Sequence, residues 1–199
     1  MTTFVTILTD GYADWETALL NATARGYYGV ETHFATPGGK PVTSAGGLRV
    51  TPDMANEDID LNAVDVLLVN GGTAWTAPGA PDISKLAQDA VAAGKIVGGI
   101  CDGTLALARA GVLDTVQHTS NSPQNLPPSG YKGESLYQDV PHAVTDGRIV
   151  TAPGTAPVSF MAAILDQLGL KDANLDFYLG MHAAEHQGIR PAASASSSG

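Results

Sequence analysis

The chain has one cysteine, Cys101, among 199 residues, and only ten lysines and arginines against twenty aspartates and glutamates. A single cysteine excludes an internal disulfide, so the fold depends on its apolar core. The net charge of −10 offers no basic face to the phosphates of a nucleic acid or an anionic membrane. No apolar run reaches the roughly 18 residues that span a bilayer. We therefore expect neither a nucleic-acid partner nor a membrane partner.

The N-terminal stretch MTTFVTILTD lacks the basic segment and apolar core of a secretory signal peptide. Together with the lone thiol, this predicts a cytoplasmic protein. The length suits a single domain, predicted over residues 1–190. Residues 191–199, PAASASSSG, have the composition of a disordered tail.

Apolar runs typical of strands alternate with helical patterns along the chain. The pattern predicts strands at 4–9, 30–36, 63–70, 95–100 and 147–152, a hairpin at 42–50, helices at 15–25, 81–94, 103–110 and 158–169, and a long loop at 118–137. This alternation predicts an α/β fold with a mostly parallel sheet and helices on both faces. Chemistry in such folds collects at the carboxyl ends of the strands, where DGYADWE, NGGTAW and GICDG lie.

Cys101 lies in the segment GGICDG, between a predicted strand and a predicted helix. The segment has the G-x-C-x-G form of a nucleophile elbow, with cysteine where hydrolases carry serine. The N-terminus of the following helix would favour the thiolate, which is the reactive form of the side chain. The alternative is a small cysteine that merely fills the core.

In the order of these motifs the chain resembles the ThiJ/PfpI family, the cysteine-containing relatives of class I glutamine amidotransferases. The resemblance covers residues 4–170 and rests on Glu16 in DGYADWE, Gly71 and Gly72 after LLVN, and Cys101 in GGICDGTLALARAGVLD. It implies a flavodoxin-like, three-layer αβα sandwich that forms a homodimer. Because no nucleotide-binding glycine motif is present, we expect no cofactor.

The resemblance implies a role for each matched residue. Cys101 would be the nucleophile, with a protonated Glu16 hydrogen-bonded to its sulfur as acid or base. The backbone N–H groups of Gly72 and Asp102 would stabilise an oxyanion. His118 in VQHTSN would be a proton carrier or substrate contact, although a structural histidine fits the same place.

Two aromatic residues, Trp75 and Tyr12, would wall the pocket, or would equally serve as core residues. Peptidases of this family carry histidine directly after the cysteine, whereas this chain has Asp102, so we expect no peptidase activity. Glutaminase activity is also not expected, because the late H-x-E arrangement of that class is missing.

A competing motif is HAAEH at 182–186, which matches the H-x-x-E-H pattern of inverted zinc peptidases. The third ligand of such a site is commonly an acidic residue well downstream, and residues 187–199 contain neither Asp nor Glu. We therefore expect a short amphipathic helix here and no metal site.

The sequence predicts a cysteine-dependent enzyme that acts on a small carbonyl or amide-like substrate. The resemblance leaves open a hydrolase, a hydratase of isocyanide-like groups, and a cofactor-free glyoxalase that converts a 2-oxoaldehyde to a hydroxy acid. The alternative is a non-catalytic redox sensor or chaperone-like protein, in which Cys101 is oxidised to a sulfinic acid capped by Glu16. A binding domain with an unreactive thiol is a third reading.

Overall fold

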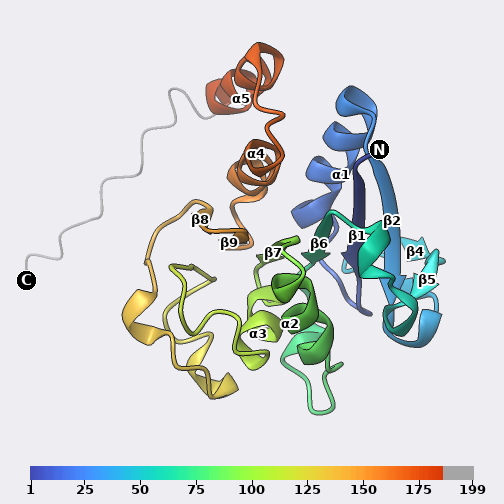
Figure 1. The fold of residues 1–199 in the computed structure, drawn as a ribbon, viewed down its shortest axis with the longest axis vertical. Coiled ribbons are helices and arrows are strands. Elements are labelled where there is room, and N and C mark those ends of the chain that lie inside the picture. Colours follow the sequence, from blue (N-terminus) through green and yellow to red (C-terminus); the bar gives the residue numbers. More distant parts are fainter. Residues whose placement is uncertain (186–199) are drawn as a thin grey trace, which may run out of the picture.

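One seven-stranded sheet organises the computed structural model, which describes residues 1–185 (Figure 1). The strand order is β5-β2-β1-β6-β7-β9-β8, and every neighbouring pair is parallel except β8 and β9. The strands are β1 (Thr3–Ile7), β2 (Glu31–Thr36), β5 (Met54–Ala55), β6 (Val66–Val69), β7 (Ile96–Ile100), β8 (Val144–Asp146) and β9 (Ile149–Ala152). The predicted tail at 191–199 lies outside the described residues.

Helices cover both faces of this sheet, and they are α1 (Asp14–Tyr28), α2 (Ser84–Ala92), α3 (Gly103–Arg109), α4 (Pro157–Gln167) and α5 (Ala173–Glu185). The apolar faces of α1, α4 and α5 share one buried cluster, and those of α2 and α3 share another on the opposite face (Figure 1). This arrangement confirms the predicted three-layer α/β sandwich.

The central strand β6 is apolar throughout because both of its faces are covered. In β6, which is buried along its whole length, Leu67 joins the cluster under α2 and α3, whereas Leu68 joins the cluster under α1 and α4. Successive side chains of a strand point to opposite faces, so a doubly covered strand needs apolar residues at every position. The predicted burial of this strand is thus confirmed.

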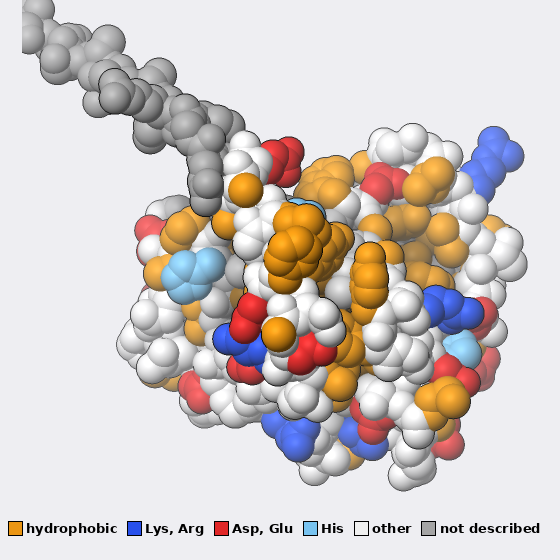
Figure 2. Space-filling model, turned by 90° about the horizontal axis from the view of Figure 1, so that it is seen from above, with side chains coloured by type: hydrophobic (Ala, Val, Ile, Leu, Met, Phe, Trp, Pro, Cys, Tyr) orange, Lys and Arg blue, Asp and Glu red, His pale blue; other side chains and the backbone are white. Residues whose placement is uncertain are grey.

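The hairpin predicted at 42–50 is present, with β3 (Val42–Thr43) antiparallel to β4 (Arg49–Val50). At the end of the described chain, α5 begins well before the short helix expected at 182–186, and it buries Leu175. Phe177 and Met181 on the same helix are exposed, and hydrophobic side chains gather on this side of the molecule (Figure 2). His186 of the HAAEH motif lies outside the described residues. Within residues 1–185 no cluster of potential metal ligands occurs. No helix in this range has the length and apolarity that crossing a membrane requires.

Candidate active site

Cys101 lies at a sharp turn between the end of β7 and the start of α3. Its φ of 55° makes it the only non-glycine residue with a positive φ among residues 1–185. Such a conformation costs on the order of 1–3 kcal/mol, so it persists only where the surroundings impose it. The Cys101 N–H donates to Ala152 O at 2.9 Å, and a Cβ at Gly103 would collide with Val69 O. The strand–turn–helix context predicted for Cys101 is therefore confirmed.

Glu16, in the first turn of α1, places its carboxyl beside this thiol although the side chain is completely buried. Its Oε2 accepts a hydrogen bond from the Gly71 N–H at 2.7 Å. The other oxygen, Oε1, faces the sulfur: a Cβ at Gly154 would lie 2.9 Å from Oε1 and 2.9 Å from Cys101 Sγ. Among the described residues Oε1 makes no hydrogen bond, and the Cys101 thiol is the polar group next to it.

Burial dominates the protonation of this pair. It raises the pKa of Glu16 to about 7, although the interaction with the Cys101 thiol and the hydrogen bond from Gly71 lower it. It also raises the pKa of Cys101 to about 12; the Asn121 amide opposes this rise, and the charges of Glu16 and Asp102 add to it. The pKa of the thiol is therefore raised, in the direction opposite to the lowering expected from the N-terminus of α3. Between pH 7 and 12 the pair therefore holds one proton and one negative charge.

Asn121, which the sequence reasoning missed, supplies the polar contact to the sulfur. Its Nδ2 donates to Cys101 Sγ at 3.1 Å and to Asp102 Oδ1 at 3.2 Å. Its Oδ1 accepts the Gly154 N–H at 2.9 Å, and a backbone N–H can only face an acceptor. This bond fixes the orientation of the amide, so its NH₂ group points at the thiol. Asn121 lies in the loop predicted at 118–137, and nothing in its local pattern singled it out.

An open cavity of about 540 Å³ lies above these groups and is called the Cys101 cavity below. It is lined by Trp15, Glu16, Cys101, Asn121, Gly154, Thr155 and Pro157. Trp15 precedes Glu16 on α1, and its indole N–H donates to Gly154 O at 2.9 Å. The ring is thus held at the rim while 56% of the residue remains exposed. Its position next to Glu16 was the signal that the sequence reasoning passed over.

The two N–H groups expected to stabilise an oxyanion belong to residues adjacent in the chain to groups of the site, and neither residue is among those that line the Cys101 cavity. Gly72 follows the residue that binds Glu16, and Asp102 follows the cysteine. Among residues 1–185 neither N–H donates a hydrogen bond to another protein group. A Cβ at Gly72 would lie 2.9 Å from Tyr12 Cα, so the close approach of these segments requires glycine there. Both groups remain candidates for the oxyanion role.

His118 does not line the Cys101 cavity. Its buried ring lies edge-on to Tyr131 and Tyr137, with centroid distances of 5.4 and 5.7 Å. Its Nδ1 donates to Val116 O at 2.8 Å, and burial lowers the pKa of the ring. The ring therefore packs among aromatic side chains away from the cavity expected for a proton carrier or substrate contact, and it is Asn121 that contacts the sulfur.

The two aromatic residues expected at the pocket also lie elsewhere. Trp75 is fully buried in the core under α2 and α3, where its indole N–H donates to Asn70 O at 2.8 Å. Tyr12 packs with Leu8 and Val42 beside the hairpin. Trp15 forms the aromatic wall in their place.

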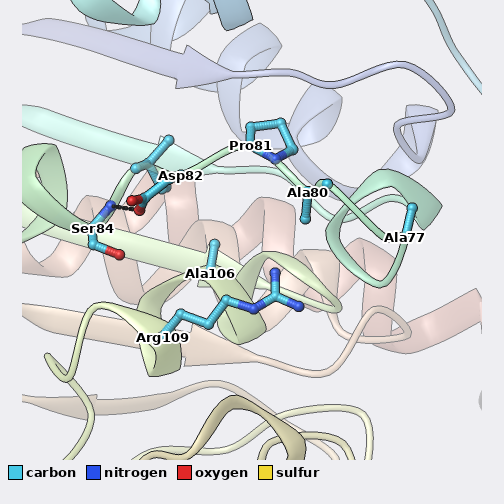
Figure 3. Close-up of a pocket in the computed structure, with 9 residues that line it drawn as sticks. Ala77, Ala80, Pro81, Asp82, Ser84, Ala106 and Arg109 are labelled. Carbon is cyan, nitrogen blue, oxygen red and sulfur yellow. Dashed lines mark hydrogen bonds between the residues drawn. The ribbon is translucent and has the colours of Figure 1, made fainter.

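A second cavity, of about 370 Å³, lies between the loop at 77–84 and α3, and it shares no lining residue with the Cys101 cavity (Figure 3). Small side chains and backbone form most of its wall (Figure 3). Its charged groups are already engaged: Arg109 donates to Trp75 O at 2.7 Å, and Asp82 accepts the Ser84 N–H at 2.8 Å. Within the described part of the chain, the second cavity holds the hydroxyl of Ser84 but no histidine or cysteine, whereas the Cys101 cavity holds a thiol beside a buried carboxyl. The Cys101 cavity is therefore the candidate active site.

Comparison with known proteins gives one consistent family. The profile of the DJ-1/PfpI family matches residues 3–167. The uncharacterized protease YoaZ of Bacillus subtilis is 36% identical over 129 residues, which are 64% of this chain and 61% of that protein. The match therefore spans less than two thirds of the length of YoaZ. The glutathione-independent glyoxalase DJR-1.2 of Caenorhabditis elegans is 30% identical over 64% of this chain and 68% of that protein.

Solved structures agree with this match. A DJ-1 superfamily protein from Agrobacterium tumefaciens is 44% identical, with a TM-score of 0.91, over 94% of this chain and all of that chain. A ThiJ/PfpI family protein from Bacillus anthracis is 30% identical, with a TM-score of 0.84, over 93% of this chain and 92% of that chain. The likeness therefore extends over nearly the whole fold.

Proposed function

The chain belongs to the DJ-1/PfpI family, and we propose that it is a cysteine-dependent enzyme acting on a small carbonyl or amide-like substrate. The observation that carries this proposal is the buried Glu16 carboxyl facing the thiol of Cys101 at the floor of an open cavity. A buried carboxyl and a strained elbow both cost stability, and such costs are concentrated at functional sites.

The proposed first step is addition of the thiol to the carbonyl carbon. The Glu16 carboxylate accepts the proton of the S–H bond while sulfur forms a bond to carbon and the carbonyl π electrons move to oxygen. The Gly72 and Asp102 N–H groups stabilise that oxygen, and Glu16 then returns the proton to it. A pKa of about 7 suits Glu16 to both transfers near neutral pH.

For a 2-oxoaldehyde the same groups complete a balanced reaction. Glu16 removes the proton from the carbon that carries sulfur, and the electron pair moves toward the neighbouring carbonyl, whose oxygen takes up a proton to give an enediol. Glu16 then delivers a proton to that neighbouring carbon, while the hydroxyl on the sulfur-bearing carbon loses its proton and becomes the carbonyl of a thioester of a 2-hydroxy acid. Water then cleaves the thioester and regenerates the thiol, so no oxidant or reductant is consumed. The relative named as a glyoxalase supports this branch of the proposal. Because His118 lies outside the cavity, all proton transfers fall to Glu16.

The arrangement offers less support for proteolysis, despite the name of the Bacillus subtilis relative. A cysteine peptidase pairs its thiol with a histidine that takes and returns the proton. No histidine lines the Cys101 cavity among the described residues. Asp102 directly follows the nucleophile, and its charge opposes ionisation of the thiol.

The test is turnover of methylglyoxal and phenylglyoxal, measured by formation of the hydroxy acids. We expect Cys101→Ser and Glu16→Gln each to abolish measurable turnover, whereas Glu31→Gln, the same substitution at an exposed position, leaves it intact. Turnover that survives in Cys101→Ser contradicts the proposal. A wild-type protein without turnover that takes up two oxygen atoms at Cys101 in dilute peroxide, and keeps its fold, instead favours the redox sensor.

A further inference from the structure

The walls of the Cys101 cavity are apolar or uncharged above the reacting pair. Trp15 and Pro157 supply apolar surface, Thr155 supplies a hydroxyl, and Asn121 and Gly154 supply amide groups. Within residues 1–185 no lysine, arginine or histidine lines the cavity. A carboxylate or phosphate on a substrate would therefore find no cationic partner there.

The charges near the sulfur all have the same sign. The Glu16 carboxyl faces Sγ, and the Asp102 carboxylate shares the Asn121 amide with it, since Nδ2 lies 3.1 Å from Sγ and 3.2 Å from Asp102 Oδ1. Ionised groups close to one another in a partly buried site repel strongly when their charges are alike. An anionic substrate would have to approach these carboxylates without compensation.

Trp15 gives the cavity a rigid aromatic rim. A tryptophan that is 56% exposed would ordinarily change rotamers, but its indole N–H is tied to Gly154 O at 2.9 Å. Gly154 is itself fixed by Asn121, which also contacts the sulfur. The indole is therefore held at a fixed position relative to the thiol. A ring in this position can pack against a flat or apolar substituent of the substrate.

We propose that the site selects uncharged carbonyl compounds with an apolar or aromatic substituent, that it discriminates against anionic ones, and that Trp15 is the residue that holds the substituent. This inference rests on the proposed function and names its substrate class. The selection operates at the cavity itself, so it is measurable without turnover.

The experiment compares three alkylating probes that share one reaction at the sulfur: iodoacetamide is uncharged, iodoacetanilide is uncharged and aromatic, and iodoacetate is anionic. Cys101 is the only thiol in the chain, so the mass of the intact protein reports its alkylation directly. Each rate is divided by the rate for the same protein unfolded in urea, which removes the intrinsic reactivity of the probe. We expect the normalised rate of iodoacetate to fall about tenfold or more below that of iodoacetamide.

Two pairs of variants separate the parts of the proposal. Trp15→Leu should lower the advantage of iodoacetanilide over iodoacetamide by about three- to tenfold, whereas Trp15→Phe, which retains an aromatic ring, should keep most of it. Asp102→Asn removes a negative charge near the sulfur, so it should reduce the ratio of the normalised iodoacetamide rate to the normalised iodoacetate rate. Asp176→Asn removes the same charge on α5 and should leave this ratio unchanged.

Equal normalised rates for all three probes overturn the proposal. A faster reaction with iodoacetate also overturns it, because it would mean that a cation reaches the cavity from elsewhere. The expected probe ranking in a protein that turns over neither glyoxal substrate would refute the proposed function and leave the discrimination standing. Turnover of both substrates together with equal normalised rates for the three probes would support the proposed function and refute the discrimination against anionic compounds.

Discussion

Burial of Glu16 predicts that folding becomes less favourable as the pH rises through the neutral range. The pKa of this carboxyl rises from 4.5 to about 7 because the side chain is removed from water. Below pH 4.5 the carboxyl is protonated in both the folded and the unfolded chain, so folding does not require burial of a charged carboxylate. As the pH rises from there, the unfolded chain loses the proton first, and the free energy of unfolding falls until the folded protein also ionises near pH 7.

The magnitude follows from the two pKa values. At 1.36 kcal/mol per pKa unit, a rise from 4.5 to about 7 corresponds to a loss of about 3 kcal/mol across this window. The Cys101 thiol adds no loss of its own there, because its pKa lies near 12. The variant that isolates this effect is Glu16→Gln, which keeps the volume and can still accept the Gly71 N–H but does not titrate.

The assay is urea unfolding followed by tryptophan fluorescence at intervals from pH 4 to pH 8. We expect the unfolding free energy of the wild type, relative to Glu16→Gln, to fall by about 3 kcal/mol over this range. For Glu31→Gln, at an exposed position, the unfolding free energy should change with pH as it does in the wild type. A constant difference between the wild type and Glu16→Gln, or one that grows with pH, would refute the assignment of a buried carboxyl with a raised pKa.

Three further predictions concern the neighbours of the pair and the assembly. Gly154→Ala places a methyl group 2.9 Å from both Cys101 Sγ and Glu16 Oε1, so alkylation of Cys101 should slow sharply. Gly26→Ala places its methyl group where no atom lies within 4 Å, so it should leave the alkylation rate unchanged. Asn121→Ala removes the donor that lowers the thiol pKa, so the pH at which alkylation accelerates should move upward in a rate–pH profile. The homodimer implied by the family resemblance predicts twice the chain mass of 20.4 kDa in light scattering, and a monomer would contradict it.

The layers of the fold were predictable because the central strands carry strong patterns. A run such as the one at 66–69 is apolar at every position, which only a doubly covered strand requires. The edge strands escaped notice for the opposite reason. β5 has two residues and β8 has three, and their side chains are partly buried or exposed, so they show neither a long apolar run nor a clear alternation.

At the site, the residues on regular elements were predictable and those on the long loop were not. Cys101 and Glu16 lie at the end of β7 and the start of α1, where the local pattern already fixes the backbone. The loop is placed by contacts between distant residues: Ser120 Oγ lies 2.7 Å from Thr104 Oγ1 and accepts from Asn125 Nδ2 at 2.9 Å. These bonds tie the start of the loop to α3, which brings the next residue, Asn121, to the sulfur. No local sequence pattern predicts that Asn121 reaches the sulfur.

The difference between an amide and an imidazole beside the sulfur changes the chemistry of the site. Asn121 donates a hydrogen bond but cannot take up or release a proton near neutral pH, whereas a histidine can. Glu16 is then the only group in contact with the thiol that titrates in this range among the described residues. Reactions that return a proton to the substrate from the same carboxyl are compatible with this arrangement. Reactions that need a separate acid for a poor leaving group, such as cleavage of a peptide bond, are not well served by it.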